Sequence, residues 1–169
     1  TQTVGYPAVS KLEKTKHMIP LLSLDKTKSC EELLAFMGDQ SVMLMLKLDG
    51  LTIKLTYENG VLQEAATRGD GDEGEVITHN VTGISGIPSH IPFKERLVVT
   101  GEAFIRPSDF AVLQETQVDS TGKPYKNGRN LAAGSVRLLE AKVCKERRIT
   151  FMAFNALEGL VTMALKSER

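Results

Sequence analysis

Lys47 is a candidate nucleophile because of the residues around it. It follows five consecutive apolar residues, 42–46, and precedes Asp49 and Gly50. A free lysine has a pKa near 10.4, so only about one amine in a thousand is unprotonated near neutral pH. An attacking lysine must therefore be desolvated or lie beside other cations, and the apolar run supplies the first condition. Asp49 opposes activation unless a metal ion or Arg68 offsets its charge. The structural alternative is an edge lysine that discourages sheet aggregation.

The elements that must position Lys47 follow from the turn signals on either side of it. Residues 41–48 are too short for a typical helix and lie between two glycines, which predicts a buried strand. Asp-Gly at 49–50 and Asn-Gly at 59–60 are typical of two-residue hairpin turns. Asp-Gly is also common in ordinary turns, so its chemical meaning depends on its context.

The two turns predict the register of a three-stranded meander. Leu48 is expected opposite Leu51, and Glu58 opposite Val61. Counting back along the second hairpin places Leu51 opposite Arg68. The Lys-x-Asp-Gly segment and Arg68 should therefore lie at the same end of one sheet.

The remaining elements alternate between helices and strands. Ser29 caps a helix that Gly38 ends, and residues 1–28 are irregular. Further elements are expected at these ranges: a helix at 75–84, a strand at 97–105, a helix that begins at Pro107, a helix at 129–139 and a strand at 149–154. Because the strand links are mostly hairpins, the class is α+β with mostly antiparallel sheets and flanking helices.

Composition excludes several classes of protein. The 169 residues carry 21 Lys+Arg and 21 Asp+Glu, and 41% are hydrophobic, which fits a globular domain. No apolar stretch approaches the roughly 18 residues of a membrane span. The cysteines, Cys30 and Cys144, and the three histidines have no metal-ligand spacing. We therefore expect no metal site within the chain, no membrane partner, and a cytoplasmic location.

Charge is unevenly distributed along the chain. Residues 58–75 hold six acids and one base, whereas residues 121–148 hold eight bases and two acids. Such runs are commonly solvated faces, and the basic run is alternatively a phosphate-binding surface. Composition leaves both interpretations open.

Lys47-Leu48-Asp49-Gly50 is a Lys-x-Asp-Gly tetrapeptide, the signature of covalent nucleotidyltransferases: DNA ligases, RNA ligases and mRNA-capping enzymes. Its context resembles the adenylation domain of bacterial NAD-dependent DNA ligases. The blocks that carry this resemblance are Pro20-x-Leu22-Ser23-Leu24-Asp25, Tyr57-Glu58-Asn59-Gly60-Val61-Leu62, Ala66-Thr67-Arg68-Gly69-Asp70-Gly71, Gly101-Glu102-Ala103-Phe104 and Arg129-Asn130-x-Ala132-Ala133-Gly134-Ser135-x-Arg137. The opening Thr1-Gln2-x-Val4-Gly5 also looks like the link that precedes this domain in the family.

The resemblance implies a role for each matching position. Lys47 would attack NAD, release nicotinamide mononucleotide and carry AMP, with Asp49 steering it. The positions that match the nucleotide site are Ser23 and Leu24 at the adenine end, Gly50 at the backbone approach, Arg68 and Glu102 at the ribose, and Phe154 where the family has a stacking tyrosine. Arg129 and Arg137 match arginines that act on phosphates of the nicked DNA or of the adenylate.

The resemblance also implies a truncated, incomplete nucleotidyltransferase fold, with 1–28 as link and adenine-contacting segment and 29–169 as core. It implies NAD and Mg²⁺, nicked duplex DNA as partner of the full-length enzyme, and a monomer. Met45 departs from the family, which has an adenine-contacting glutamate there, and Gly128 replaces a proline. Later Asp-Gly-x-Val and Lys-x-Lys blocks are not found in the sequence.

Other interpretations stay open. Arg68, Glu102, Arg129 and Arg137 could be solvated surface residues, and Phe154 could belong to the core. The whole chain could be a degenerate, non-catalytic relative that binds adenylate or DNA, or an ATP- or GTP-using RNA ligase or capping enzyme.

Overall fold

The central strand of the protein forms where polar and apolar residues alternate. In the computed structural model, which describes residues 12–22, 25–119 and 121–159, this strand is β2 (Leu51–Glu58). Ile53, Leu55 and Tyr57 are at most 2% exposed in the core, whereas the residues between them face the opposite side. The positive φ angles at 59–60, 54° and 76°, fit the hairpin turn predicted there.

Four strands form one antiparallel sheet in the order β3-β2-β5-β6. The other strands are β3 (Val61–Thr67), β5 (Leu97–Phe104) and β6 (Thr150–Glu158). A second, two-stranded sheet pairs β1 (Lys14–Lys16) with β4 (Glu73–Glu75). The α+β class with antiparallel sheets is confirmed, and β1 adds a short strand to a segment predicted to be irregular.

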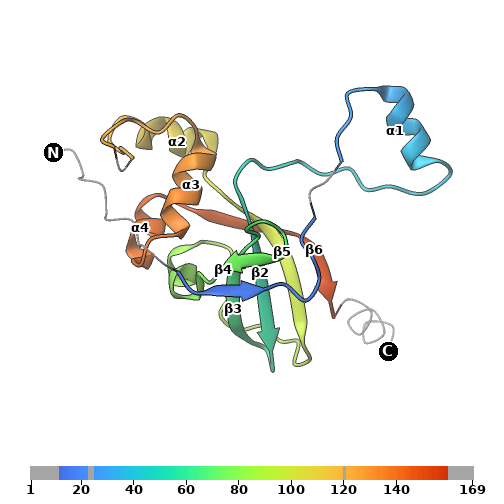
Figure 1. Ribbon diagram of the computed structural model, residues 1–169, viewed down its shortest axis with the longest axis horizontal. Helices are drawn as coiled ribbons and strands as arrows, with labels where there is room; N and C mark the ends of the chain where they lie inside the picture. Colours follow the sequence, from blue (N-terminus) through green and yellow to red (C-terminus); the bar gives the residue numbers. More distant parts are fainter. Residues whose placement is uncertain (1–11, 23–24, 120, 160–169) are drawn as a thin grey trace.

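The helices gather at one end of the large sheet, except α1 (Figure 1). Their bounds are α1 (Cys30–Met37), a 3-10 helix η1 (Thr78–Gly83), α2 (Pro107–Leu113), α3 (Gly128–Val136) and α4 (Ala141–Glu146). Residues of η1, α3 and α4 pack with β2 and β5 in one hydrophobic core. Of the helix predicted at 75–84, only the short η1 forms, because the backbone N–H groups of Val76 and Ile77 donate to the carbonyl oxygens of Glu13 and Ala65 instead.

The predicted start and end of α1 are confirmed. Ser29 accepts a hydrogen bond from the Glu32 backbone N–H, and Gly38 ends the helix at φ 51°. However, α1 buries no residue, and it projects away from the sheets (Figure 1).

The expectation of a buried strand at 41–48 is wrong. These residues form no regular structure, and the apolar run at 42–46 is exposed, with Leu44 98% exposed. The expected pairing of Leu48 with Leu51 is also wrong, because β2 pairs with β3 on one side and β5 on the other. An apolar run becomes a strand only where a neighbouring strand accepts its hydrogen bonds, and both edges of β2 are taken.

The predicted register of the second hairpin holds at the turn and shifts by one further on. Glu58 lies opposite Val61, as predicted, but the register shifts between Thr56 and Tyr57. Such a bulge leaves one residue of β3 without a counterpart in β2. The Arg68 backbone N–H therefore donates to the Thr52 carbonyl oxygen at 3.0 Å, one residue beyond the position predicted.

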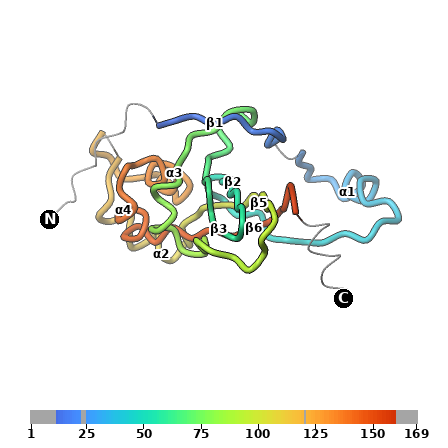
Figure 2. The backbone as a smooth tube through the Cα atoms, turned by 90° about the horizontal axis from the view of Figure 1, so that it is seen from below, coloured from blue at the N-terminus to red at the C-terminus, as the bar shows by residue number. Residues whose placement is uncertain are grey.

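Residues 13–22, which we call the strap, include β1. The strap lies beside the turn that follows β3. Figure 2 shows β1 on one side of the large sheet, separated from it. The His17 N–H donates to the Asp72 carbonyl oxygen at 2.8 Å, and the Leu21 N–H to the Gly71 carbonyl oxygen at 2.9 Å. The strap is thus fastened to the turn that carries Arg68. Among the helices in the described part of the chain, none has the length and apolar character needed to cross a membrane.

Candidate functional site

Gly50 of the Lys-x-Asp-Gly segment packs directly against the backbone of β5. A β-carbon at Gly50 would lie only 2.1 Å from the Ala103 carbonyl oxygen of β5. Only glycine therefore fits at this position. The glycine of the Lys-x-Asp-Gly segment is explained here by its contact with β5 rather than by a hairpin turn.

Glu102 joins β5 to that segment. One carboxylate oxygen, Oε1, accepts the Gly50 backbone N–H at 3.1 Å, and Oε2 accepts the Thr52 hydroxyl at 3.0 Å. Each carboxylate oxygen has a second lone pair, so Glu102 can accept further hydrogen bonds. Glu102 is half-buried and anchors the start of β2 through these two hydrogen bonds.

A row of side-chain positions crosses the four strands at this end of the sheet. Thr52 lies opposite Glu102, and Glu102 lies opposite Met152 of β6. Arg68 continues the row on the other side, next to Thr52. Directly opposed residues in antiparallel strands project from the same face. The row therefore offers a cation, a hydroxyl, a carboxylate and a thioether on one face.

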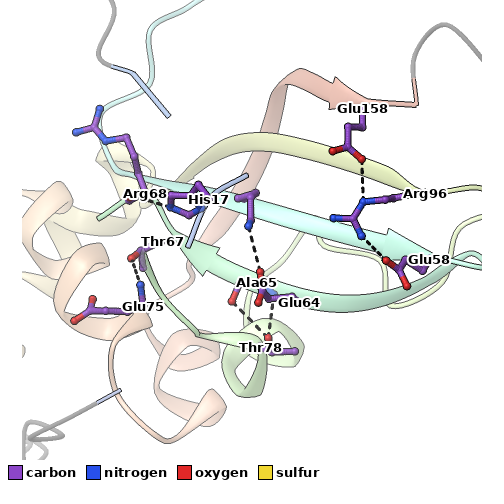
Figure 3. Close-up of polar contacts among 11 residues, drawn as sticks. His17, Glu58, Glu64, Ala65, Thr67, Arg68, Glu75, Thr78, Arg96 and Glu158 are labelled. Atoms are coloured by element: carbon purple, nitrogen blue, oxygen red, sulfur yellow. Dashed lines mark hydrogen bonds and ion pairs between the residues drawn. The ribbon is translucent and has the colours of Figure 1, made fainter. Parts of the chain in front are cut away.

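The guanidinium of Arg68 is available to a ligand. Its side chain is half-buried, and no carboxylate of the described residues lies within ion-pair distance of it. Figure 3 shows the side chain extending away from His17, beyond the end of β3. Arg68 and Glu102, predicted to act together, are thus brought to the same end of the sheet.

Arg129 connects the site to the helical end of the molecule. It lies in the first turn of α3, 3.6 Å from an Asp49 carboxylate oxygen, and both side chains are more than half exposed. A cation in the first turn is unfavourable for the helix itself because the helix dipole is positive there. Stability of α3 therefore does not explain Arg129.

Arg137, the C-cap of α3, is held elsewhere by a 2.6 Å contact between its Nε and a Glu75 carboxylate oxygen. Three more of the basic residues at 121–148 have polar or charged partners: Lys142 with Glu146, Arg148 with Asp109, and Arg147 with Gln117 and Ser135. Much of the basic run is therefore already neutralised or bonded within the described part of the fold, which argues against a free phosphate surface for those residues; Arg147 itself is buried, at 4% exposed.

Lys47 does not have the buried setting that the apolar run predicted. It is exposed, as is Met45, two residues before it. Phe154, 42% exposed on β6, is not a core residue, so that alternative is wrong. Ser23 and Leu24, like the opening block at 1–5, lie outside the described residues.

The described residues contain no cluster of three or more His, Cys, Asp or Glu side chains suited to a metal ion. A small hollow lies on the same face of the sheet, two rows further along, and is lined by Lys54, Arg96 and Glu158 among others. Its charges are paired: Lys54 with Glu64 at 3.2 Å, and Arg96 with Glu58 and Glu158. This hollow is distinct from the row that includes Glu102.

Two contacts of the site could not be found from the sequence. Thr52 supports Glu102, and His17, one of the three histidines without metal-ligand spacing, contacts the Arg68 backbone. Both contacts join residues about 50 positions apart, and neither residue type has a spacing that marks it.

Comparisons with known proteins show what the chain is similar to. The model of the NAD-dependent DNA ligase adenylation domain family matches residues 9–168. The DNA ligase of Ruminiclostridium cellulolyticum is 47% identical over 156 residues, which cover 92% of this chain and 24% of the relative. The DNA ligase of Lachnoclostridium phytofermentans is 45% identical, over 91% of this chain and 23% of the relative. The DNA ligase of Methylococcus capsulatus is 40% identical, over 91% of this chain and 25% of the relative. The chain spans about a quarter of the length of these relatives.

Proposed function

The chain belongs to the NAD-dependent DNA ligase adenylation domain family, and on that premise we propose that it takes AMP from NAD onto Lys47. The unprotonated Lys47 Nζ attacks the α-phosphorus of NAD. A phosphorus–nitrogen bond forms, the pyrophosphate P–O bond breaks, nicotinamide mononucleotide leaves, and the lysine loses a proton. In the longer ligase the AMP would pass to the 5′-phosphate of a DNA nick, which is then sealed.

One observation carries this proposal: the Glu102 carboxylate holds the backbone of the Lys-x-Asp-Gly segment. The hydrogen bond supports the proposal that the ribose-binding carboxylate and the segment with the nucleophile act as a single unit. A bound AMP whose ribose lies on the Glu102–Arg68 row would have its phosphate near the segment at 47–50. Positioning of this kind is the main requirement of phosphoryl transfer.

Two further residues support a site for the phosphates. Asp49 lies beside Arg129, and Arg129 stands at the positive end of α3. Both the guanidinium and the helix dipole favour negative charge there. Mg²⁺ commonly binds through one or two carboxylates plus substrate phosphates, so we propose that it arrives with the dinucleotide.

A lysine nucleophile is activated by desolvation or by neighbouring cations. Since Lys47 is exposed, we expect the chain by itself to form the adduct slowly or not at all. A longer protein, in which this chain is extended by the flanking regions of the Ruminiclostridium relative, should form it readily.

The test is an intact-mass measurement after incubation with NAD and Mg²⁺. We expect the extended protein to gain one adenylyl group, Lys47→Ala to gain none, and the exposed-lysine control Lys142→Ala to gain it as the parent does. Replacement of NAD by ATP should give no adduct; an adduct from ATP alone would point to an RNA ligase or capping-type enzyme.

A second function is favoured by Met45, which replaces an adenine-contacting glutamate of the family. A degenerate relative would bind adenylate or DNA without transfer. Binding of AMP without any adduct in the extended protein would establish this function and refute the first.

A further inference from the structure

His17 is the side chain that joins the strap to the turn that carries Arg68. Its Nε2 lies 3.1 Å from the Arg68 carbonyl oxygen, and the ring is 7% exposed. The same oxygen accepts the Gly71 backbone N–H at 3.1 Å. Figure 3 shows the His17 ring next to the Arg68 backbone at the end of β3.

The local structure is shaped to accept this ring. A β-carbon at Gly74 would lie 2.9 Å from His17 Nε2 and 1.8 Å from the Thr67 carbonyl oxygen. A side chain at position 74 would therefore displace the imidazole. The backbone N–H of His17 itself and that of Leu21, four residues further on, hold the strap that carries the ring.

The chemistry of the contact fixes which nitrogen carries the proton. A carbonyl oxygen only accepts hydrogen bonds, so Nε2 donates to Arg68. Nδ1 is then an acceptor, and it is buried without a hydrogen-bond partner in the described part of the chain. An unsatisfied buried acceptor costs free energy, whereas an apolar ring would fill the same space without that cost. Packing alone therefore does not explain a histidine here; the hydrogen bond to Arg68 does.

We propose that His17 is a positioning residue for Arg68 in ribose recognition, an inference that rests on the proposed function. The Arg68 guanidinium has no ion pair with another described residue, so its direction depends on how its backbone is held. Thr52 holds its N–H, and Gly71 and His17 hold its carbonyl oxygen. His17 is the side-chain member of this set, and it holds the backbone from which the guanidinium extends beyond the end of β3.

The test compares binding of AMP and 2′,3′-dideoxy-AMP by isothermal titration calorimetry, in the chain and in the extended protein. We expect His17→Ala to weaken AMP binding about tenfold, the effect of a lost hydrogen bond between the ribose and the charged Arg68 guanidinium. Binding of the dideoxy nucleotide should weaken less than twofold. His17→Gln, whose amide can reach the same carbonyl, should restore AMP binding, and the shorter His17→Asn should not. In an Arg68→Ala background, His17→Ala should cause no further loss.

His79 provides a matched control, because its Nε2 lies 2.9 Å from the Leu138 carbonyl oxygen, far from the row. His79→Ala should lower thermal stability without changing the ratio of the two affinities. If His17→Ala does not fold by circular dichroism, the comparison of Gln with Asn decides the question.

The outcomes separate the two proposals. Suppose that the parent binds AMP more tightly than the dideoxy nucleotide, but that His17→Ala lowers the affinity for both equally, or still lowers AMP affinity in the Arg68→Ala background. The positioning role is then refuted and the proposed function stands. If neither the chain nor the extended protein binds AMP, the proposed function is refuted, and the role of His17 in ribose recognition falls with it.

Discussion

The hydrogen bond from Thr52 to Glu102 can be removed by a change of a few atoms. Thr52→Val keeps the β-branched shape that suits a strand but removes the hydroxyl that donates to Glu102 Oε2 at 3.0 Å. The Gly50 N–H would then be the remaining support of the carboxylate on this side. We expect the carboxylate to become more mobile and to bind ribose hydroxyls less well.

The size of the effect follows from the exposure of the pair. A hydrogen bond to a charged group contributes about 1.5–3 kcal/mol when buried. Thr52 and Glu102 are both half-buried, so we take about 1 kcal/mol, which corresponds to a fivefold loss of AMP affinity. For a chain of this length, a loss of about 1 kcal/mol in unfolding free energy lowers the melting temperature by about 2–4 °C.

The assay is calorimetric AMP titration of the parent, Thr52→Val and Thr52→Ser, together with melting curves. Thr56→Val is a matched control, because Thr56 is on the same face of β2, four residues further along and opposite Val98 rather than Glu102. We expect Thr52→Ser to bind as the parent does. Equal affinities for Thr52→Val and Thr56→Val would refute the argument that Glu102 needs its strand neighbour.

Three other predictions concern separate parts of the chain. Gly50→Ala should prevent adduct formation in the extended protein and lower the melting temperature, because its β-carbon would collide with the Ala103 carbonyl oxygen; normal melting and a normal adduct would contradict this. Burial raises the pKa of the Cys144 thiol to about 11, so a thiol reagent at pH 8 should label exposed Cys30 alone. The stability that the neutral Cys144 thiol contributes should be lost as pH rises from about 9 toward 11. Two labels in the folded chain would refute the argument. Met45→Glu should strengthen AMP binding about tenfold by supplying a carboxylate for adenine; unchanged affinity would show that position 45 does not face the base.

Elements specified by neighbouring residues could be predicted from the sequence. The hairpin at 59–60 depends on two residues that tolerate positive φ, and α1 depends on Ser29 and Gly38. The strands β5 and β6 were also found near their predicted positions. In each case the signal lies within a few residues of the element that it determines.

Features that depend on distant partners could not be predicted in the same way. The apolar run at 42–46 has the composition of a buried strand, but burial depends on what covers it, and in the described structure it is exposed. The bulge in β3 shifts Arg68 by one position relative to β2, and no glycine or proline at 61–67 marks it. Thr52 lies opposite Glu102 because β2 pairs with β5. The hydrophobic pattern alone does not specify which strand pairs with β2.

The Lys-x-Asp-Gly segment shows why a motif can identify chemistry while misplacing the backbone. Asp-Gly predicts a hairpin turn, yet Gly50 is required by the close approach of β5. The strand that imposes this requirement also carries Glu102, whose carboxylate accepts the Gly50 N–H. The spacing of the motif therefore encodes a contact with a strand 50 residues away, and a variant that disturbs the segment should disturb the carboxylate as well.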